Sequence, residues 1–270
     1  MSREDPIGIF DSGIGGLTVA NAVSKQLPNE EIIYFGDTAH LPYGDKSSEA
    51  IQHYSSHIAD FLLGKKCKLI LIACNTASAA AFTTIKAHVG DKVPLLNVID
   101  PVVSAVATDD SIKKIGIIGT KGTIKSAVYE HKLKILRPDL ESVSLATALL
   151  ASMIEAGFYN NSVSQAVINS YLAYPDFSDI DGMILACTHY PLIETEISSF
   201  FNDRVKIFDS TYIVATEVKK KLAALNLLSE ARSNTHHFYV SDYTESFELT
   251  TKLFFQEKIH LEHCGIWEEG

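Results

Sequence analysis

Short apolar runs of strand length alternate along the chain with longer stretches in which apolar residues recur at helical spacing. In the first part of the chain, the pattern predicts strands at residues 7–10, 31–35, 68–73 and 94–99 and helices at residues 17–27, 47–63 and 75–89. The run at residues 68–73 is almost continuously apolar, as expected for a strand that is buried on both faces of a parallel sheet. This order predicts an α/β fold, in which helices cover both faces of a mainly parallel sheet.

A second set of alternating elements follows, with strands expected at residues 114–118, 141–145 and 182–186 and helices at residues 149–156, 163–171 and 209–228. Its strand ending in Ala186-Cys187 resembles the earlier strand ending in Ala73-Cys74. Each of the two follows a strand and a glycine-containing loop at a similar distance, which favours an internal duplication. We therefore expect two similar α/β domains, related by a pseudo-twofold axis, with the ligand site in the cleft between them.

The boundary between the two domains is expected near Asp100-Pro101, although no linker rich in proline, glycine or serine separates the two sets. A long helix from about Tyr212 would return the chain to the first half. The first domain is therefore predicted to comprise residues 1–99 and 212–270, and the second domain residues 100–211.

Composition and charge exclude several classes of protein. The 270 residues are 46% hydrophobic, enough for a substantial core, and their net charge of −10 disfavours contact with nucleic acid. No targeting segment is recognised, and no apolar run approaches the roughly 20 residues of a membrane helix, so we expect a soluble, cytoplasmic protein without a membrane partner. The glycines at residues 13–16 lack dinucleotide spacing and no Walker lysine follows them, while the cysteines form no CxxC pair. Nicotinamide, nucleotide and metal cofactors are therefore not supported.

Two of the four cysteines, Cys74 and Cys187, follow expected parallel strands at the end where α/β sheets bind ligands. A lone cysteine at a strand end is usually core packing, and we keep that interpretation for Cys67 and Cys264. Two cysteines at matching strand ends instead indicate a pair of thiols that face one cleft. Such a pair suits a racemase, because a thiolate can take a proton from one face of a carbon while a thiol returns one to the other face.

The polar residues that follow each cysteine bear on its chemistry. Asn75 and Thr76 follow the first cysteine and Thr188 follows the second, and each could begin a helix. A free cysteine has a pKa of about 8.5, and a helix N-terminus favours its thiolate as well as a substrate carboxylate. His189 could move protons to and from Cys187, or it could simply bond to backbone.

Two further segments are candidates for ligand contact. Asp11 ends the first strand and precedes Ser12 and a glycine-rich loop that can hold an anion, although a helix N-cap is the simpler interpretation of the aspartate. The string at residues 42–44, Pro42-Tyr43-Gly44, could present backbone N–H groups, or it could be an ordinary turn.

From about Ile7 to Leu222 the chain resembles the glutamate racemase family, which lies within the wider aspartate/glutamate racemase superfamily. The resemblance is carried, in the family's order and spacing, by residues 8–19 (GIFDSGIGGLTV), 34–37 (YFGD) with 42–44 (PYG), 73–77 (ACNTA) and 185–192 (LACTHYPL). It implies a two-domain α/β fold, no cofactor, homodimers, and glutamate as substrate, with the D-glutamate product supplied to peptidoglycan synthesis.

The resemblance also implies a role for individual residues. Cys74 would take the α-proton from D-glutamate and Cys187 from L-glutamate, with Asp11 beside the first thiol and His189 beside the second. The residues that it implies for substrate binding are Asp11, Ser12, Pro42, Tyr43, Gly44, Asn75, Thr76, Thr123, Thr188 and His189.

The chain departs from the family pattern in its second half. Where the family has a string like Pro-Leu-Val-Glu-Glu-Gly, residues 151–157 read ASMIEAG. Glu155 matches the first acid and is a further candidate catalytic residue, whereas Ala156 replaces the second acid. The Cys-Pro pair common upstream is absent, with Ala146-Thr147 near that place, and the tail after about Asn234 matches only loosely.

Two alternatives remain open from the sequence. The protein could be a racemase or decarboxylase for another acid, such as aspartate, although the loop strings resemble those of glutamate racemases. It could also be a binding or regulatory protein that has lost catalysis, an interpretation that the loss of either cysteine would have favoured.

Overall fold

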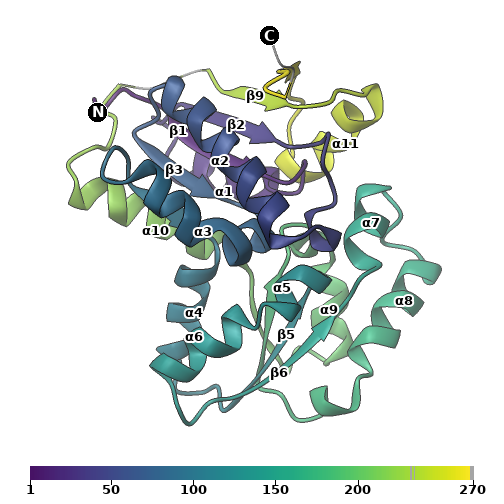
Figure 1. The fold of residues 1–270 in the computed structure, drawn as a ribbon. Helices are drawn as coiled ribbons and strands as arrows, with labels where there is room; N and C mark the ends of the chain where they lie inside the picture. Colours follow the sequence, from purple (N-terminus) through teal and green to yellow (C-terminus); the bar gives the residue numbers. More distant parts are fainter. Residues whose placement is uncertain (232, 234, 268–270) are drawn as a thin grey trace.

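The structure is a computed structural model that describes residues 1–231, 233 and 235–267, and its strands form two separate parallel sheets flanked by helices (Figure 1). The first sheet has the order β10-β9-β2-β1-β3-β4, and the second has the order β6-β5-β7-β8. The strands of the first sheet are β1 (Ile7–Asp11), β2 (Ile32–Gly36), β3 (Leu69–Ile72), β4 (Leu95–Asn97), β9 (His237–Val240) and β10 (Leu261–His263). Those of the second sheet are β5 (Lys114–Gly119), β6 (Glu141–Ala146), β7 (Gly182–Ala186) and β8 (Lys206–Phe208). The predicted α/β fold is confirmed.

The two sheets share one strand order. Four strands of the first sheet have the order β2-β1-β3-β4, and the second sheet has the order β6-β5-β7-β8. Numbered along the chain within each set, both orders are 2-1-3-4. All of these neighbours pair in parallel. Cys74 after β3 and Cys187 after β7 therefore occupy equivalent places in the two sheets, as the internal repetition of the sequence predicts.

Helices cover both faces of the first sheet because its strands alternate their side chains between two layers. In β1, Ile7 and Ile9 pack with residues of α1 (Leu17–Gln26) and α10 (Ser210–Ala224), whereas Phe10 packs with residues of α2 (Ser48–Gly64) and α3 (Asn75–Val89). The core on the α1 side continues without interruption into the second sheet. The remaining helices are α4 (Ile99–Ala107), α5 (Lys121–Lys125), α6 (Val128–Leu136), α7 (Leu150–Glu155), α8 (Ser162–Leu172), α9 (Glu194–Phe200) and α11 (Glu245–Phe255), with short 3-10 helices at η1 (Tyr43–Asp45), η2 (Pro175–Phe177) and η3 (Tyr190–Ile193).

The junction at β4 differs from its prediction. A strand was expected at residues 94–99, but β4 ends at Asn97 and α4 begins at Ile99. The side-chain oxygen of Asn97 accepts hydrogen bonds from the backbone N–H groups of Ile99 and Asp100, so this side chain begins the helix that leads toward the second sheet.

The last part of the chain returns to the first sheet. Helix α10 packs beside α1, and β9 and β10 then extend the sheet next to β2 (Figure 1). Assigning residues 1–99 with 212–270 to one domain and residues 100–211 to the other remains our proposal. Residues 232, 234 and 268–270 of that range lie outside the described residues.

A close backbone contact fixes the loop after β1 against the end of β2. A Cβ atom on Gly36 would lie 2.2 Å from the carbonyl oxygen of Gly13, which also accepts a hydrogen bond from the Tyr34 hydroxyl at 2.8 Å. One residue further on, the Asp37 N–H donates to the Asp11 carbonyl at 3.0 Å. A glycine is therefore required at this position if the two loops are to keep their places.

We predict that Gly36→Ala lowers the free energy of unfolding by about 1–3 kcal/mol, because the added methyl group must displace backbone rather than a flexible side chain. The matched control is Gly64→Ala at the exposed end of α2, where a Cβ meets no atom of the described residues within 4 Å. That variant should remain within about 0.5 kcal/mol of the wild type in urea unfolding. Equal stability of the two variants would contradict the prediction.

Candidate active site

A narrow cavity at the carboxyl ends of the strands is lined by residues from both halves of the chain. Its walls include both cysteines, and the full lining is Ser12, Leu41, Pro42, Tyr43, Gly44, Cys74, Asn75, Thr76, Thr120, Ala151, Ser152, Glu155, Cys187, Thr188 and His189. Most of the residues that were predicted to bind a ligand thus meet around one small space. Both thiols line this cavity, so neither cysteine serves only to pack the hydrophobic core.

Cys74 lies at the start of α3, where its Sγ accepts a hydrogen bond from the Ala77 N–H at 3.3 Å. Its thiol also lies 3.6 Å from the Ser12 hydroxyl. Burial, and next the negative charge of Asp11, raise the pKa of the Cys74 thiol to about 12, although Ala77 and Ser12 lower it. The predicted effect of the helix N-terminus is present, but desolvation outweighs it.

Asp11 lies behind the cavity wall rather than on it. Its side chain is 1% exposed, and one oxygen accepts from the Gly16 N–H at 2.8 Å, while Oδ1 has no hydrogen-bond partner among the described residues. Burial raises the pKa of the Asp11 carboxyl, opposed by His189. The helix-cap interpretation is wrong, because the residue before α1 is Gly16. A buried carboxylate with a free oxygen near a thiol can instead exchange a proton with its surroundings.

Around the second thiol, three side chains form a chain of contacts. The Cys187 Sγ lies 3.5 Å from Nδ1 of His189, whose Nε2 lies 2.8 Å from the Glu155 carboxylate. Burial alone would lower the pKa of His189, but Cys187 and Glu155 together hold it well above its ordinary value. The raised pKa favours the charged form of the imidazole, which is oriented by Glu155 at the end of α7 and lies beside the thiol. A charged imidazole stabilises a neighbouring thiolate.

Polar side chains complete the cavity and bridge the two halves. The Tyr129 hydroxyl, from α6, donates to Oδ1 of Asn75 at 2.6 Å, and Nδ2 of this buried amide has no partner among the described residues. Thr76 and Thr120 place their hydroxyl oxygens 2.8 Å apart. These N–H and O–H groups, with the N-terminus of α3, are suited to hold carboxylates.

One expected contact lies elsewhere. Thr123 is 1% exposed and does not line the cavity, because it belongs to the first turn of α5, where its N–H donates to the hydroxyl of Thr120. Thr120 lines the cavity in its place. Sequence reasoning missed Thr120, Leu41, Ala151 and Ser152. The internal repeat could have indicated Thr120, because it follows β5 as Ser12 follows β1.

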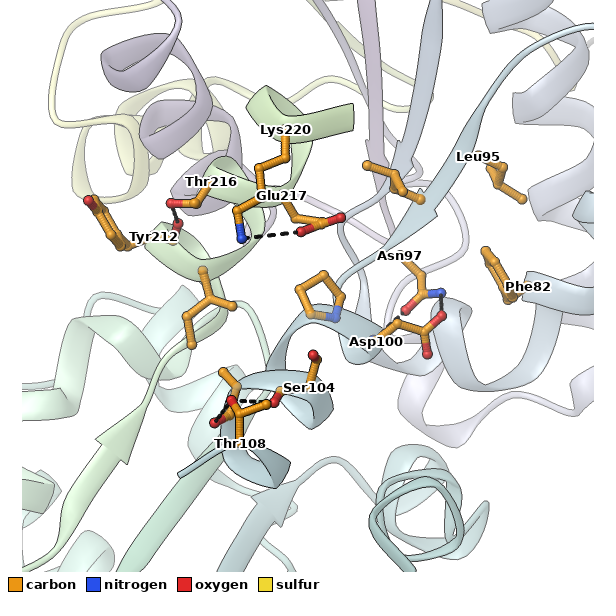
Figure 2. Close-up of a pocket in the computed structure, with 14 residues that line it drawn as sticks. Phe82, Leu95, Asn97, Asp100, Ser104, Thr108, Tyr212, Thr216, Glu217 and Lys220 are labelled. Carbon is orange, nitrogen blue, oxygen red and sulfur yellow. Dashed lines mark hydrogen bonds and ion pairs between the residues drawn. The ribbon is translucent and has the colours of Figure 1, made fainter. Parts of the chain in front are cut away.

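A larger cavity, of about 580 Å³, lies apart from the thiols between α4 and α10 (Figure 2). Its polar groups face each other: the Asn97 amide donates to Asp100 at 2.8 Å, and Lys220 lies 3.9 Å from Glu217. Among the described residues, no cysteine or histidine lines it. The groups suited to proton transfer line the smaller cavity instead.

Comparison with known proteins agrees with this geometry. A sequence model of the Asp/Glu/Hydantoin racemase family matches residues 17–218. The chain belongs to this family. It is 39% identical to a glutamate racemase from Geobacter metallireducens, with 89% of each chain covered, and 38% identical to one from Streptococcus pneumoniae, with 97% of this chain and 98% of the relative covered.

The three-dimensional structure is also similar to solved structures of glutamate racemases. A crystal structure of glutamate racemase from Francisella tularensis in complex with D-glutamate superposes with a TM-score of 0.91 at 37% identity, covering 98% of each chain. The resemblance seen in the sequence is confirmed, and the protein is an amino-acid racemase. Among the described residues, no helix is long and apolar enough to cross a membrane.

The pair formed by His189 and Glu155 predicts a pH-dependent contribution to stability. Because the pKa of His189 is raised on folding, this contribution is fully present below the unfolded value of about 6.5 and is lost as pH rises through the folded pKa. Glu155→Gln should therefore lower the free energy of unfolding by about 1–3 kcal/mol near pH 6 and by progressively less at higher pH.

Urea unfolding of wild type and variant between pH 6 and pH 9 would measure this difference. The matched control is Asp60→Asn, which removes the carboxylate from a solvent-exposed pair with His88. It should change stability by less than about 0.5 kcal/mol at every pH. A gap between Glu155→Gln and wild type that stays constant with pH would show that His189 does not carry the charge.

Proposed function

We propose that this racemase interconverts L- and D-glutamate, with Cys74 and Cys187 acting on opposite faces of the α carbon. One observation carries the proposal: two thiols at equivalent strand ends of two sheets line a single narrow cavity. A racemase needs an acid and a base on opposite sides of one carbon, and the two thiols meet that need.

In the proposed reaction the Cys74 thiolate takes the α-proton of D-glutamate, and the Cys187 thiol gives a proton to the opposite face. The electron pair left on the α carbon forms the new C–H bond, so the first cysteine ends as a thiol and the second as a thiolate. The reverse reaction starts from L-glutamate with the roles exchanged. Protons and electrons balance without a cofactor, and we propose that neither pyridoxal phosphate nor a metal ion is needed.

Each thiol has a different neighbour to assist it. The charged imidazole of His189, held by Glu155, would stabilise the Cys187 thiolate and restore its proton. Because the pKa of Cys74 is raised to about 12, its thiolate needs a proton acceptor nearby. Asp11, one of whose buried oxygens has no hydrogen-bond partner in the part of the chain that the structure describes, is suited to that role.

Glutamate matches the cavity in charge, because it carries two carboxylates and the walls offer separate groups of donors. Ser12, Asn75 and Thr76 lie on the side of the first sheet, and Thr120 and Thr188 on the side of the second. Relatives that are named glutamate racemases, and the Francisella tularensis protein in complex with D-glutamate, support this choice over aspartate. From the family we further propose a cytoplasmic homodimer that supplies D-glutamate for peptidoglycan.

The function is tested by incubating purified protein with L-glutamate and following circular dichroism. The signal should decay to zero as the mixture becomes racemic, without added pyridoxal phosphate and equally fast with a metal chelator. L-Aspartate serves as the alternative substrate, and the variant with both cysteines changed to serine serves as the inactive control. Racemisation of aspartate but not glutamate would indicate a related enzyme, and no turnover of either acid would indicate a binding protein.

A second prediction distinguishes a mechanism with two catalytic bases from a mechanism with one. Cys74→Ser and Cys187→Ser should each lose racemisation by about 100- to 10,000-fold, because serine is a far weaker acid and base. A glutamate analogue with chlorine on the β carbon loses chloride after a single deprotonation, so one thiol is enough. Cys74→Ser should therefore still eliminate chloride from the L-analogue, through Cys187, and Cys187→Ser from the D-analogue, through Cys74. Loss of the same enantiomer's reaction in both variants would exclude the assignment.

A further inference from the structure

A buried carboxylate lies behind the active site and has no part in the proposed proton transfers. Asp37 follows β2 and is 0% exposed. Its oxygens accept hydrogen bonds from the Tyr43 hydroxyl at 2.6 Å, the Ser241 hydroxyl at 2.7 Å and the Trp267 indole N–H at 3.0 Å. Nδ1 of His40 lies 3.0 Å from both oxygens. The carboxylate is thus surrounded by donors.

These donors come from segments that are far apart in the sequence. Tyr43 begins η1, Ser241 follows β9, and Trp267 lies at the end of the described chain. Burying a charge costs free energy of desolvation, and hydrogen bonds to a buried carboxylate offset that cost only while the donors keep their places. Asp37 therefore requires a defined arrangement of the segments that it joins.

One of those segments forms part of the cavity. Tyr43 is 1% exposed and lines the cavity with Pro42 and Gly44, and a Cβ on Gly44 would lie 2.9 Å from the side chain of Thr120. The backbone N–H of Asp37 also donates to the carbonyl of Asp11. Asp37 therefore contacts two parts of the site at once, the loop that carries Tyr43 and the strand end that carries Asp11.

We infer that Asp37 is a positioning residue, which fixes the substrate-binding loop of residues 42–44 through the Tyr43 hydroxyl and ties this loop to the segment that carries Trp267. This inference rests on the proposed glutamate racemisation. Asp37 does not touch the substrate in this assignment. It acts through Tyr43, so its removal loosens the loop and weakens substrate binding while both thiols stay in place.

The tryptophan offers a direct view of this connection. Trp267 is the single tryptophan of the sequence, and its ring lies edge-on to His40, at 4.7 Å between centroids, and to Tyr54, at 5.5 Å. Its indole N–H donates to the same carboxylate as Tyr43. Substrate that draws the loop of residues 42–44 into place should therefore change the fluorescence of Trp267.

Steady-state kinetics test the inference through a double-mutant cycle. Asp37→Asn should raise KM for both enantiomers about tenfold, as expected for the loss of a hydrogen bond to a charged group, with kcat changed by less than about threefold. Tyr43→Phe should raise KM similarly, and adding Asp37→Asn to it should raise KM little further, because both changes break the same contact. A purely structural role would instead lower the active fraction, and so kcat, and leave KM unchanged.

Milder variants keep the test decisive if Asp37→Asn folds poorly. Ser241→Ala and Trp267→Phe each remove one donor from Asp37 without touching the cavity, and each should raise KM by about two- to fivefold. The matched control is Ser198→Ala, which removes a serine hydroxyl that donates to Asp203 on the exposed surface. KM should not change in that variant. If none of the variants around Asp37 raised KM, the inference would be overturned.

Fluorescence gives the second measurement. In the wild type, titration with D-glutamate should change Trp267 emission with a midpoint close to KM, and in Asp37→Asn the change should be lost although substrate still turns over at high concentration. If the wild-type enzyme is active but its Trp267 emission does not change at saturating glutamate, the proposed connection between the loop of residues 42–44 and Trp267 is overturned. A wild type without glutamate racemisation would overturn the proposed function, and with it the inference. The two failures are therefore distinguishable.

Discussion

The structure brings two thiols, one from the end of a strand in each sheet, to one small cavity, and the arrangement of the two sheets follows from that constraint. A single parallel sheet presents its strand ends on one side only, so two sheets must face each other. Hydrogen bonds beside the thiols, two of them buried and one partly buried, hold the two halves in that position. The Thr18 hydroxyl donates to the carbonyl of Thr188, Thr76 meets Thr120, and Tyr129 holds the amide of Asn75. Each bond lies within two residues of a cysteine on one side, so the contact between the halves and the geometry of the site are the same feature.

The charges around the two thiols differ although the strands that carry them are equivalent. The neighbour of Cys74 is the carboxyl group of Asp11, and the neighbour of Cys187 is the imidazole of His189, whose pKa is raised. An anion favours the thiol form and a cation favours the thiolate. In the proposed mechanism this pair, a Cys74 thiol and a Cys187 thiolate, acts on L-glutamate, and D-glutamate requires the opposite pair, which forms when the neighbouring groups exchange protons with the thiols. The duplicated fold thus supplies the symmetry of position, and the residues around it supply the difference in charge.

The sequence predicted those parts of the fold that depend on local pattern. The strand expected at residues 182–186 is β7 to the residue, because a buried parallel strand is apolar throughout. The strands β9 and β10 and the helix α11 were not predicted. β9 gains its place by pairing Phe238 with Tyr34, a contact between distant segments that no local periodicity reveals. The predicted strand ran past the true end of β4 at Asn97 for another reason. The side chain of this last strand residue also accepts the hydrogen bonds that begin α4.

The same distinction applies to the site. Cys74, Cys187 and His189 could be recognised because their strings fix both residue type and position at a strand end. Thr123 was chosen where Thr120 lines the cavity, because a turn of helix decides which hydroxyl faces inward.

Asp37 could not be assigned a role at all, although it stands within a familiar string. In the sequence it is a charged residue after a strand, which is usually solvated. Its burial appears only when Ser241 and Trp267 return from the far end of the chain and donate to it. A charge that water would solvate at little cost is then held by protein donors, and such a charge is stable only while these partners keep their places. That dependence is what makes a buried carboxylate suitable for fixing a loop, and it is a property of the assembled fold that no single segment of the sequence carries.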